Sequence, residues 1–249
     1  MHHTTVLSVG CTSIKSIAII ASDPTCFDLE EIMSYIRHTI VSVQPGKKDA
    51  FLSQLTTQLD SIKSTAGLMG IRVVDAGNNR VVGTTVYDSK ESADAASQRA
   101  SEVRESTAEF LTEAPFVREG EVAWRYIAEG VEGRPPMPGY ARHLAVGYEP
   151  SKFEAMLAYL ESQTGIYQSI DGLRRILVTP ISGSEDHPQF RERIGNLDNR
   201  MIVTVGYDSK AQSEAARDKV NAFWVSMAEF LTGQPLVSEG EFVYGHSNR

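Results

Sequence analysis

The sequence predicts an α+β protein in which two ferredoxin-like βαββαβ units follow each other in one chain. The first observation behind this prediction is an internal repeat. Tyr35-Ile-Arg-His38 returns as Tyr140-Ala-Arg-His143, 105 residues later, and Tyr87-Asp-Ser-Lys90 returns as Tyr207-Asp-Ser-Lys210, 120 residues later. The larger second shift places an insertion of 15 residues in the second copy, within residues 180–199. Blocks that recur in the same order indicate a duplicated fold.

The second observation is that each copy alternates strand-like and helix-like patterns. Apolar residues at steps of three and four predict helices over residues 51–62 and 93–110, and Asp88 or Ser89 is suited to cap the second helix. Residues 75–79 predict a hairpin turn. Strands are predicted at Ile36–Val43, Leu68–Val74, Arg80–Tyr87 and Val117–Tyr126 in the first copy, and at Ala141–Tyr148, Met201–Tyr207 and Val237–His246 in the second.

The boundaries of the copies follow from the same pattern. Residues 35–127 form the first unit and residues 140–249 the second, joined by a linker over 128–139 that is rich in Gly and Pro. Residues 1–34 fit neither copy, and we expect an N-terminal extension there. The only two cysteines, Cys11 and Cys26, lie in that extension and give no disulfide framework, which favours a cytoplasmic location.

Composition excludes several classes of function. The chain is 41% hydrophobic and 22% charged, as in globular proteins, and its net charge is −8. An acidic surface without a Lys/Arg cluster argues against nucleic acid as a partner. No apolar run approaches the ~20 residues that a membrane span needs. No metal motif occurs either, because His187 stands beside two carboxylates without the spacing of a ligand set.

The third observation is a difference between the two faces of each predicted strand. In the first strand, Arg37 shares a face with Thr39 and Val41, whereas His38 shares the other face with Ile40. A βαββαβ unit places both helices on one face of its sheet, so the other face needs a cover. We expect the helix-free faces of the two sheets to pack on each other. Small residues there predict a cavity lined by His38, His143, Thr84 and Thr204.

The chain resembles the dimeric α+β barrel superfamily, in particular its antibiotic-biosynthesis-monooxygenase-like and stress-responsive groups. The motifs are Val43-Gln-Pro-Gly46, the Tyr-Asp-Ser-Lys blocks, and the closing Glu-Phe-Leu-Thr…Pro…Val…Glu-Gly-Glu pattern. This resemblance implies a barrel formed by the two fused units. It also implies cofactor-independent oxygenation of an aromatic or quinol-like compound, haem degradation, or no chemistry. Haem-degrading members use an Asn that the first strand lacks.

Two functional hypotheses follow. In the first, the chain is a cofactor-free monooxygenase that binds a small aromatic molecule. His38 or His143 is then the catalytic base, Arg37 and Arg142 stabilise negative charge, and Trp124 stacks on the substrate, with Thr84 and Thr204 as further contacts. In the second, the chain is a non-catalytic barrel with a stress-related or interaction role. The same residues then have structural roles: the histidines are hydrogen-bonded, the arginines form surface salt bridges and the tryptophan packs in the core. A homodimer of the fused chain stays open in both.

Overall fold

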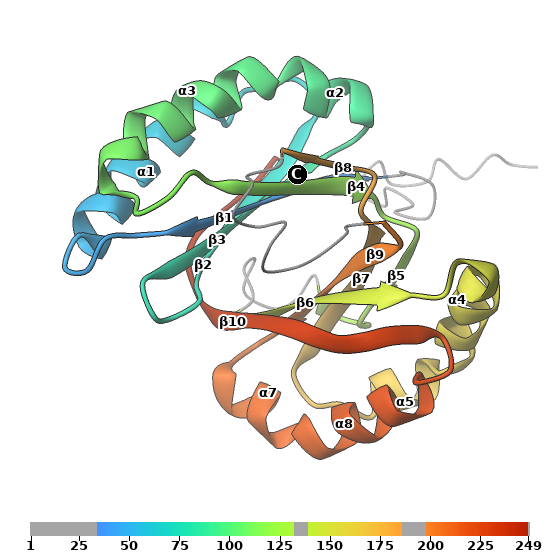
Figure 1. The fold of residues 1–249 in the computed structure, drawn as a ribbon. Helices are drawn as coiled ribbons and strands as arrows, with labels where there is room; N and C mark the ends of the chain where they lie inside the picture. Colours follow the sequence, from blue (N-terminus) through green and yellow to red (C-terminus); the bar gives the residue numbers. More distant parts are fainter. Residues whose placement is uncertain (1–33, 132–138, 186–197, 249) are drawn as a thin grey trace, which may run out of the picture. The chain divides into compact units, whose positions relative to one another are not determined.

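The computed structural model describes residues 34–131, 139–185 and 198–248. Most of the expected N-terminal extension, of the linker and of the insertion, including His187, lies outside the described residues. The first unit folds as βαββαβ, as the sequence predicted (Figure 1). Its elements are β1 (Tyr35–Ser42), α1 (Lys48–Ile62), β2 (Leu68–Asp75), β3 (Arg80–Tyr87), α2 (Lys90–Ala95), α3 (Ser97–Thr107), η1 (Ala108–Phe110), β4 (Phe116–Glu121) and β5 (Trp124–Ile127).

The second unit repeats this order. Its elements are β6 (Tyr140–Tyr148), η3 (Pro150–Lys152), α4 (Phe153–Ser162), α5 (Thr164–Gln168), β7 (Leu173–Pro180), β8 (Gly183–Glu185), β9 (Arg200–Tyr207), α7 (Lys210–Ala215), α8 (Arg217–Ser226) and β10 (Leu231–Ser247). None of the helices in the described ranges combines the length and the apolar character needed to cross a membrane.

Local signals in the sequence explain several of these boundaries. The hydroxyl of Ser89 accepts a hydrogen bond from the backbone N–H of Ser92, so Ser89 caps its helix as predicted. Ser209, its equivalent in the second unit, accepts one from Gln212 in the same way. Asn78 and Asn79 take positive φ angles of 46° and 58°, which forms the turn between β2 and β3. The predicted single helix over 93–110 instead breaks at Ala96, between α2 and α3.

The strands form a closed barrel because the last strand of each unit pairs with both units. β10 pairs with β6 over Leu231–Glu241 and then with β2 over Glu241–Ser247. In the same way β4 pairs with β1, and its continuation β5 pairs with β7. The ten strands follow the order β5-β7-β9-β6-β10-β2-β3-β1-β4-β8. This order closes on itself because β5 continues β4 along the chain, and hydrogen bonds from Ala123 to Val178 and from Ser182 to Glu119 lie at that junction.

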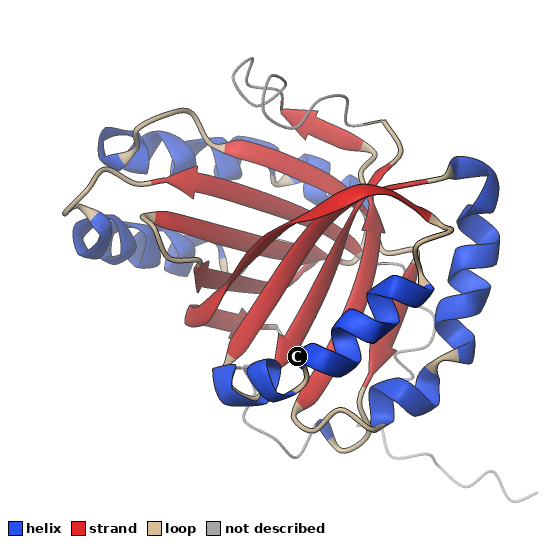
Figure 2. Ribbon diagram, turned by 60° about the horizontal axis from the view of Figure 1, so that its bottom comes forward, coloured by secondary structure: helices blue, strands red, loops and turns tan. Residues whose placement is uncertain are grey.

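The helices cover the outer faces of the barrel, and the inner faces pack on each other. Helices α1 and α3 lie over the first sheet, and α4, α5, α7 and α8 lie over the second (Figures 1 and 2). The predicted packing of helix-free faces is therefore confirmed. Part of the interior is a buried apolar cluster that combines residues of both units, namely Ile40, Val74, Val82, Phe116 and Ala141.

Two equivalent glycines lie where the exchanged strands come close to the other unit. A Cβ atom on Gly120 would lie 1.9 Å from the backbone oxygen of Pro180, and one on Gly240 would lie 1.7 Å from that of Asp75. Both obstacles are backbone atoms, which cannot move without disturbing a ladder. Only glycine therefore fits at these two positions.

We predict that Gly120→Ala and Gly240→Ala each lower the free energy of unfolding by about 1–3 kcal/mol, the usual cost of overpacking. Urea unfolding measures the change. Gly165→Ala is the control, because a Cβ on Gly165 meets nothing within 4 Å, and it should leave stability unchanged or slightly raised. Equal behaviour of the three variants would contradict this account of barrel closure.

Candidate functional site

A cavity of about 90 Å³ lies between the first sheet and helices α1 and α3. It lies on the helix side of the first sheet, and not between the two sheets, where the sequence predicts a cavity. Most of its lining is apolar, contributed by α1, α3 and the strands beneath them. Among the lining residues are Val41, Phe51, Leu55, Leu59, Ile62, Val73, Val81, Tyr87, Ala100 and Val103.

Small residues in the middle of the first sheet make room for this cavity. Thr39 on β1 and Gly83 on β3 are direct register partners, and both line it. At the equivalent place in the second unit, Leu144 on β6 is paired with Val203 on β9, and both are buried in an apolar cluster. The second sheet therefore fills the space that the first sheet leaves open.

The helices show the same difference between the units. Ala100, Val103 and Thr107 of α3 line the cavity. By the repeat, their counterparts are Val220, Phe223 and Met227, and Phe223 and Met227 pack in the filled core of the second unit. Larger side chains on α8 thus close the equivalent space, and the described part of the chain has an open half-site in the first unit and a filled one in the second.

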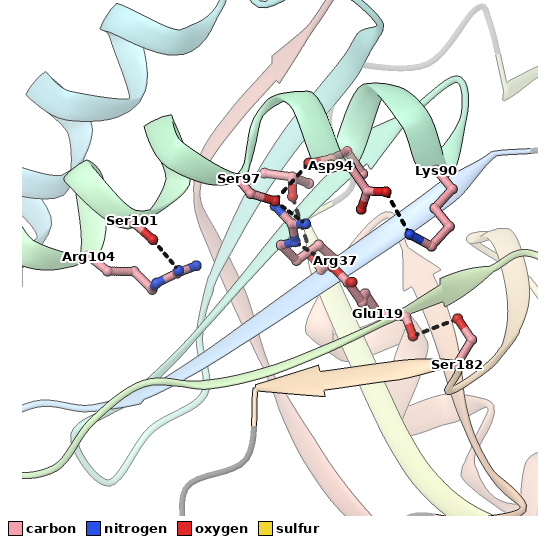
Figure 3. Close-up of polar contacts among 10 residues, drawn as sticks. Arg37, Lys90, Asp94, Ser97, Ser101, Arg104, Glu119 and Ser182 are labelled. Atoms are coloured by element: carbon pink, nitrogen blue, oxygen red, sulfur yellow. Dashed lines mark hydrogen bonds and ion pairs between the residues drawn. The ribbon is translucent and has the colours of Figure 1, made fainter.

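Arg37 places a buried guanidinium at the cavity. Its side chain extends from β1 toward the start of α3, and it is 5% exposed (Figure 3). Nε donates to Glu119 Oε2 at 2.6 Å, and Nη2 donates to Ser97 Oγ at 3.1 Å. The third nitrogen, Nη1, is buried and has no hydrogen-bond partner in the part of the chain that the structure describes. A buried donor without a partner costs free energy, so this N–H group is suited to donate a hydrogen bond to an oxygen atom of a ligand.

The charged residues of the lining are all cations. Arg99 and Arg104 line the cavity together with Arg37, and no Asp or Glu is among the described lining residues. Arg99 is paired with Glu102 at 3.1 Å. Arg104 donates to Ser101 Oγ at 2.7 Å (Figure 3). An apolar cavity beside three guanidinium groups favours a ligand with an apolar body and an anionic group.

Haem does not fit this site. Tyr87 is present, but the described lining residues include no His, Cys or Met to serve as an axial ligand, and the volume is far below that of a tetrapyrrole. Elsewhere in the described ranges, no group of three or more His, Cys, Asp and Glu is placed to hold a metal ion.

His38 and His143 lie inside the barrel, between the two sheets. Their ring centroids are 5.3 Å apart in an edge-to-face arrangement, and both side chains are buried. The His38 Nδ1 atom forms a 3.0 Å hydrogen bond with Thr84 Oγ1. The inward orientation is as expected, but the cavity lies on the opposite face of the sheet. The sheet therefore separates both predicted bases from a ligand bound beside Arg37.

Burial determines the protonation of the two histidines. It holds the pKa of His38 well below the ordinary value, and the neighbouring His143 and Arg118 lower it further. Burial, aided by Arg118, lowers the pKa of His143 to about 4. Both imidazoles are thus neutral at pH 7, so neither can supply a positive charge there.

Arg142 and Trp124 make structural contacts with residues of the second unit. Arg142 forms an ion pair with Glu239 at 2.7 Å, equivalent to that of Arg37 but beside a filled core. Trp124 packs 5.7 Å from the ring of Tyr167 and donates through Nε1 to Glu161, so it does not face the histidines. Thr204 is the register partner of His143, and Thr84 that of His38, so both lie near the interior pair; Thr84 also lines the cavity beside Arg37.

Sequence reasoning missed the residues that create the cavity. Thr39, Gly83 and Ser97 carry no motif, and Arg104 reads as an exposed helix residue. A signal was nevertheless present in the repeat itself. When the two copies are aligned, small or polar residues of the first copy correspond to large apolar residues of the second. The pairs are Thr39 and Leu144, Gly83 and Val203, and Arg104 and Trp224.

Comparisons with known proteins rest on structure alone, because a scan against family models and a search of curated proteins find no match. An anthrone oxidase-like protein superposes with a TM-score of 0.65 at 16% identity, covering 88% of this chain and 94% of that one. A candidate monooxygenase from Fusobacterium nucleatum gives 0.65 at 8% identity, covering 87% and 95%. A chlorite dismutase variant from Candidatus Nitrospira defluvii gives 0.56 at 9%, covering 85% and 91%.

These likenesses extend over both units of this chain and over nearly the whole of each matched chain. At such low identities they concern the fold and not the chemistry. Together with the exchanged strands and the inward-facing sheets, they show the fold that the sequence predicted. The chain has the dimeric α+β barrel fold, with both halves fused in one polypeptide.

Proposed function

We propose that the cavity of the first unit binds a compact aromatic molecule through an ionised oxygen, and that the chain oxygenates this molecule without a cofactor. The observation that carries the proposal is the buried Nη1 atom of Arg37, which has no partner and belongs to a residue that lines an apolar cavity. A phenolate or enolate oxygen would satisfy this donor, and the ring would occupy the apolar remainder.

The charge of the lining suits the chemistry of such a substrate. Because an opposite charge nearby favours the ionised form, Arg37, with Arg99 and Arg104, lowers the pKa of a bound phenol or enol. No base among the described lining residues is then required, and the proton leaves to water. The resulting anion is electron-rich, which is the property that allows a carbon atom to react directly with O₂.

The reaction can be written so that atoms and electrons balance. The substrate anion transfers electrons to O₂, and a C–O bond forms to give a peroxide at a ring carbon that carries hydrogen. Protonation of the peroxide, cleavage of its O–O bond and loss of the C–H proton give a carbonyl group and water. A CH₂ group and O₂ thus become C=O and H₂O, which matches the anthrone-type chemistry that the name of one structural neighbour suggests.

The volume of the cavity restricts the substrate. Ligand pockets usually measure ~300–1,000 Å³, whereas this one measures about 90 Å³. A single ring is therefore favoured over a tricyclic compound, unless a larger molecule extends through the mouth or moves α1 and α3 apart. Among quinol-type and anthrone-type compounds, we expect single-ring quinols to react best.

We predict that Arg37→Met lowers kcat/KM for oxygen uptake with such quinols by about 10- to 100-fold, because a charge-assisted hydrogen bond contributes about 1.5–3 kcal/mol. The matched control is Arg142→Met, which removes the equivalent ion pair from the filled unit. It should change stability to a similar extent but leave oxygen uptake close to that of the wild type. Oxygen-electrode assays and thermal unfolding separate the two effects.

The outcomes distinguish the two functional hypotheses. Saturable ligand binding that depends on Arg37, without oxygen uptake, would indicate a binding protein instead of an oxygenase. Binding that is equal in Arg37→Met and Arg142→Met would refute the site itself.

A second prediction uses the filled unit as a template. Thr39→Leu combined with Gly83→Val introduces the residues that the second unit carries at Leu144 and Val203. A Cβ on Gly83 would meet its nearest neighbour at 3.7 Å, which is ordinary contact. We expect the double variant to abolish ligand binding and to raise the free energy of unfolding by about 1–2 kcal/mol, since it fills a cavity. Calorimetric titration and urea unfolding measure both; retained binding would refute the position of the site.

A further inference from the structure

The interior of the barrel contains polar atoms that the proposed function does not use. Five of these atoms are buried and have no hydrogen-bond partner among residues 34–131, 139–185 and 198–248: His38 Nε2, His143 Nδ1, Thr204 Oγ1, and Nε and Nη1 of Arg118. These residues come from four strands of both units. Arg118 is the register partner of His38, and Thr204 that of His143, so the side chains are neighbours across the ladders.

We propose that this cluster, which we call the interior cluster (His38, His143, Arg118 and Thr204), binds a small inorganic anion such as chloride. Arg118 is 6% exposed and has no acidic partner among the described residues, and its guanidinium lies 5.0 Å from the centroid of the Phe116 ring. Burial of an unpaired charge is costly, and an anion would neutralise it. Neutral imidazole N–H groups and a hydroxyl would complete the coordination.

The charges around the cluster favour an anion over a metal cation. Arg118 acts on both histidines, and Arg80 and Arg200 act on Arg118, so the charges that reach the cluster within the described part of the chain are positive. Burial, together with these two arginines, lowers the pKa of Arg118 to about 10, which leaves it charged at pH 7. The guanidinium charge of Arg118 would repel a metal cation, although the neutral imidazoles alone could bind one.

The symmetry of the barrel supports a single site. The histidines and threonines are duplicated, but the counterpart of Arg118 in the second unit is Ser238, which is the register partner of His143. One guanidinium therefore serves both histidines, and the stoichiometry should be one anion per chain.

The test is the ³⁵Cl resonance of sodium chloride, measured with the full chain at constant ionic strength set by sodium gluconate. The wild type should broaden the resonance beyond its width in buffer alone. Sodium bromide should reverse this excess broadening saturably, at one site per chain. Arg118→Met should abolish this excess, whereas Lys210→Met, which removes one charge from an exposed residue, should retain it. Absence of saturable broadening in the wild type would overturn the proposal, whether or not the Arg118 variant folds.

The anion should also change how the protein responds to acid. Because the folded-state pKa values of His38 and His143 are lowered, the unfolded chain binds more protons, and stability is lost as pH falls from about 6.5 toward 4. A bound anion favours protonated imidazoles and raises their pKa. Chloride in place of gluconate should therefore raise the melting temperature at pH 5 by about 2–4 °C, and less at pH 8. The same shift in Arg118→Met would count against the site.

Discussion

The exchange of the last strands between the two units is the constraint on which the rest of the structure depends. Each final strand completes its own sheet and then pairs with the second strand of the other unit, so neither sheet has a free edge where the units meet. Unpaired edges expose backbone donors and acceptors, and their removal stabilises a sheet against association with other chains. Gly120 and Gly240 permit the close backbone approach that this pairing needs.

Closure gives the two faces of each sheet different environments. Side chains on the inner face are largely shielded from solvent, so His38 and His143 are neutral there, and Arg118 has no acidic partner among the described residues. The outer face lies under helices, and its character depends on how well their side chains fill the interface. Thr39 and Gly83 leave a gap beside Arg37, whereas Leu144 and Val203 leave none beside Arg142. Arg37 and its immediate neighbour His38 therefore lie on opposite faces of β1, one beside the cavity and the other inside the barrel.

The fold could be predicted from the sequence because the same pattern of strands and helices occurs in both copies, so each copy supports the assignment of the other. Strand β3 was predicted with the observed bounds, and the capping serines, the hairpin and the inward direction of His38 also followed from local rules. The cavity could not be located in this way. Its position depends on the volume that packed side chains leave between them. That volume is set by several elements together, whereas the periodicity of apolar residues describes only one element at a time. The break at Ala96 and the split of the last strand of the first unit likewise follow from tertiary pairing.

The contrast between the open and the filled unit has a consequence for how such a protein can change. In a dimer of identical chains, every substitution occurs twice, so a residue that enlarges a binding space in one subunit also weakens the core of the other. A fused chain is free of this coupling. Here Phe223 and Trp224 occur in one unit while Val103 and Arg104 occupy the same places in the other. The first unit can thus keep a cavity, which lowers its stability, while the well-packed core of the second unit helps to keep the whole chain folded.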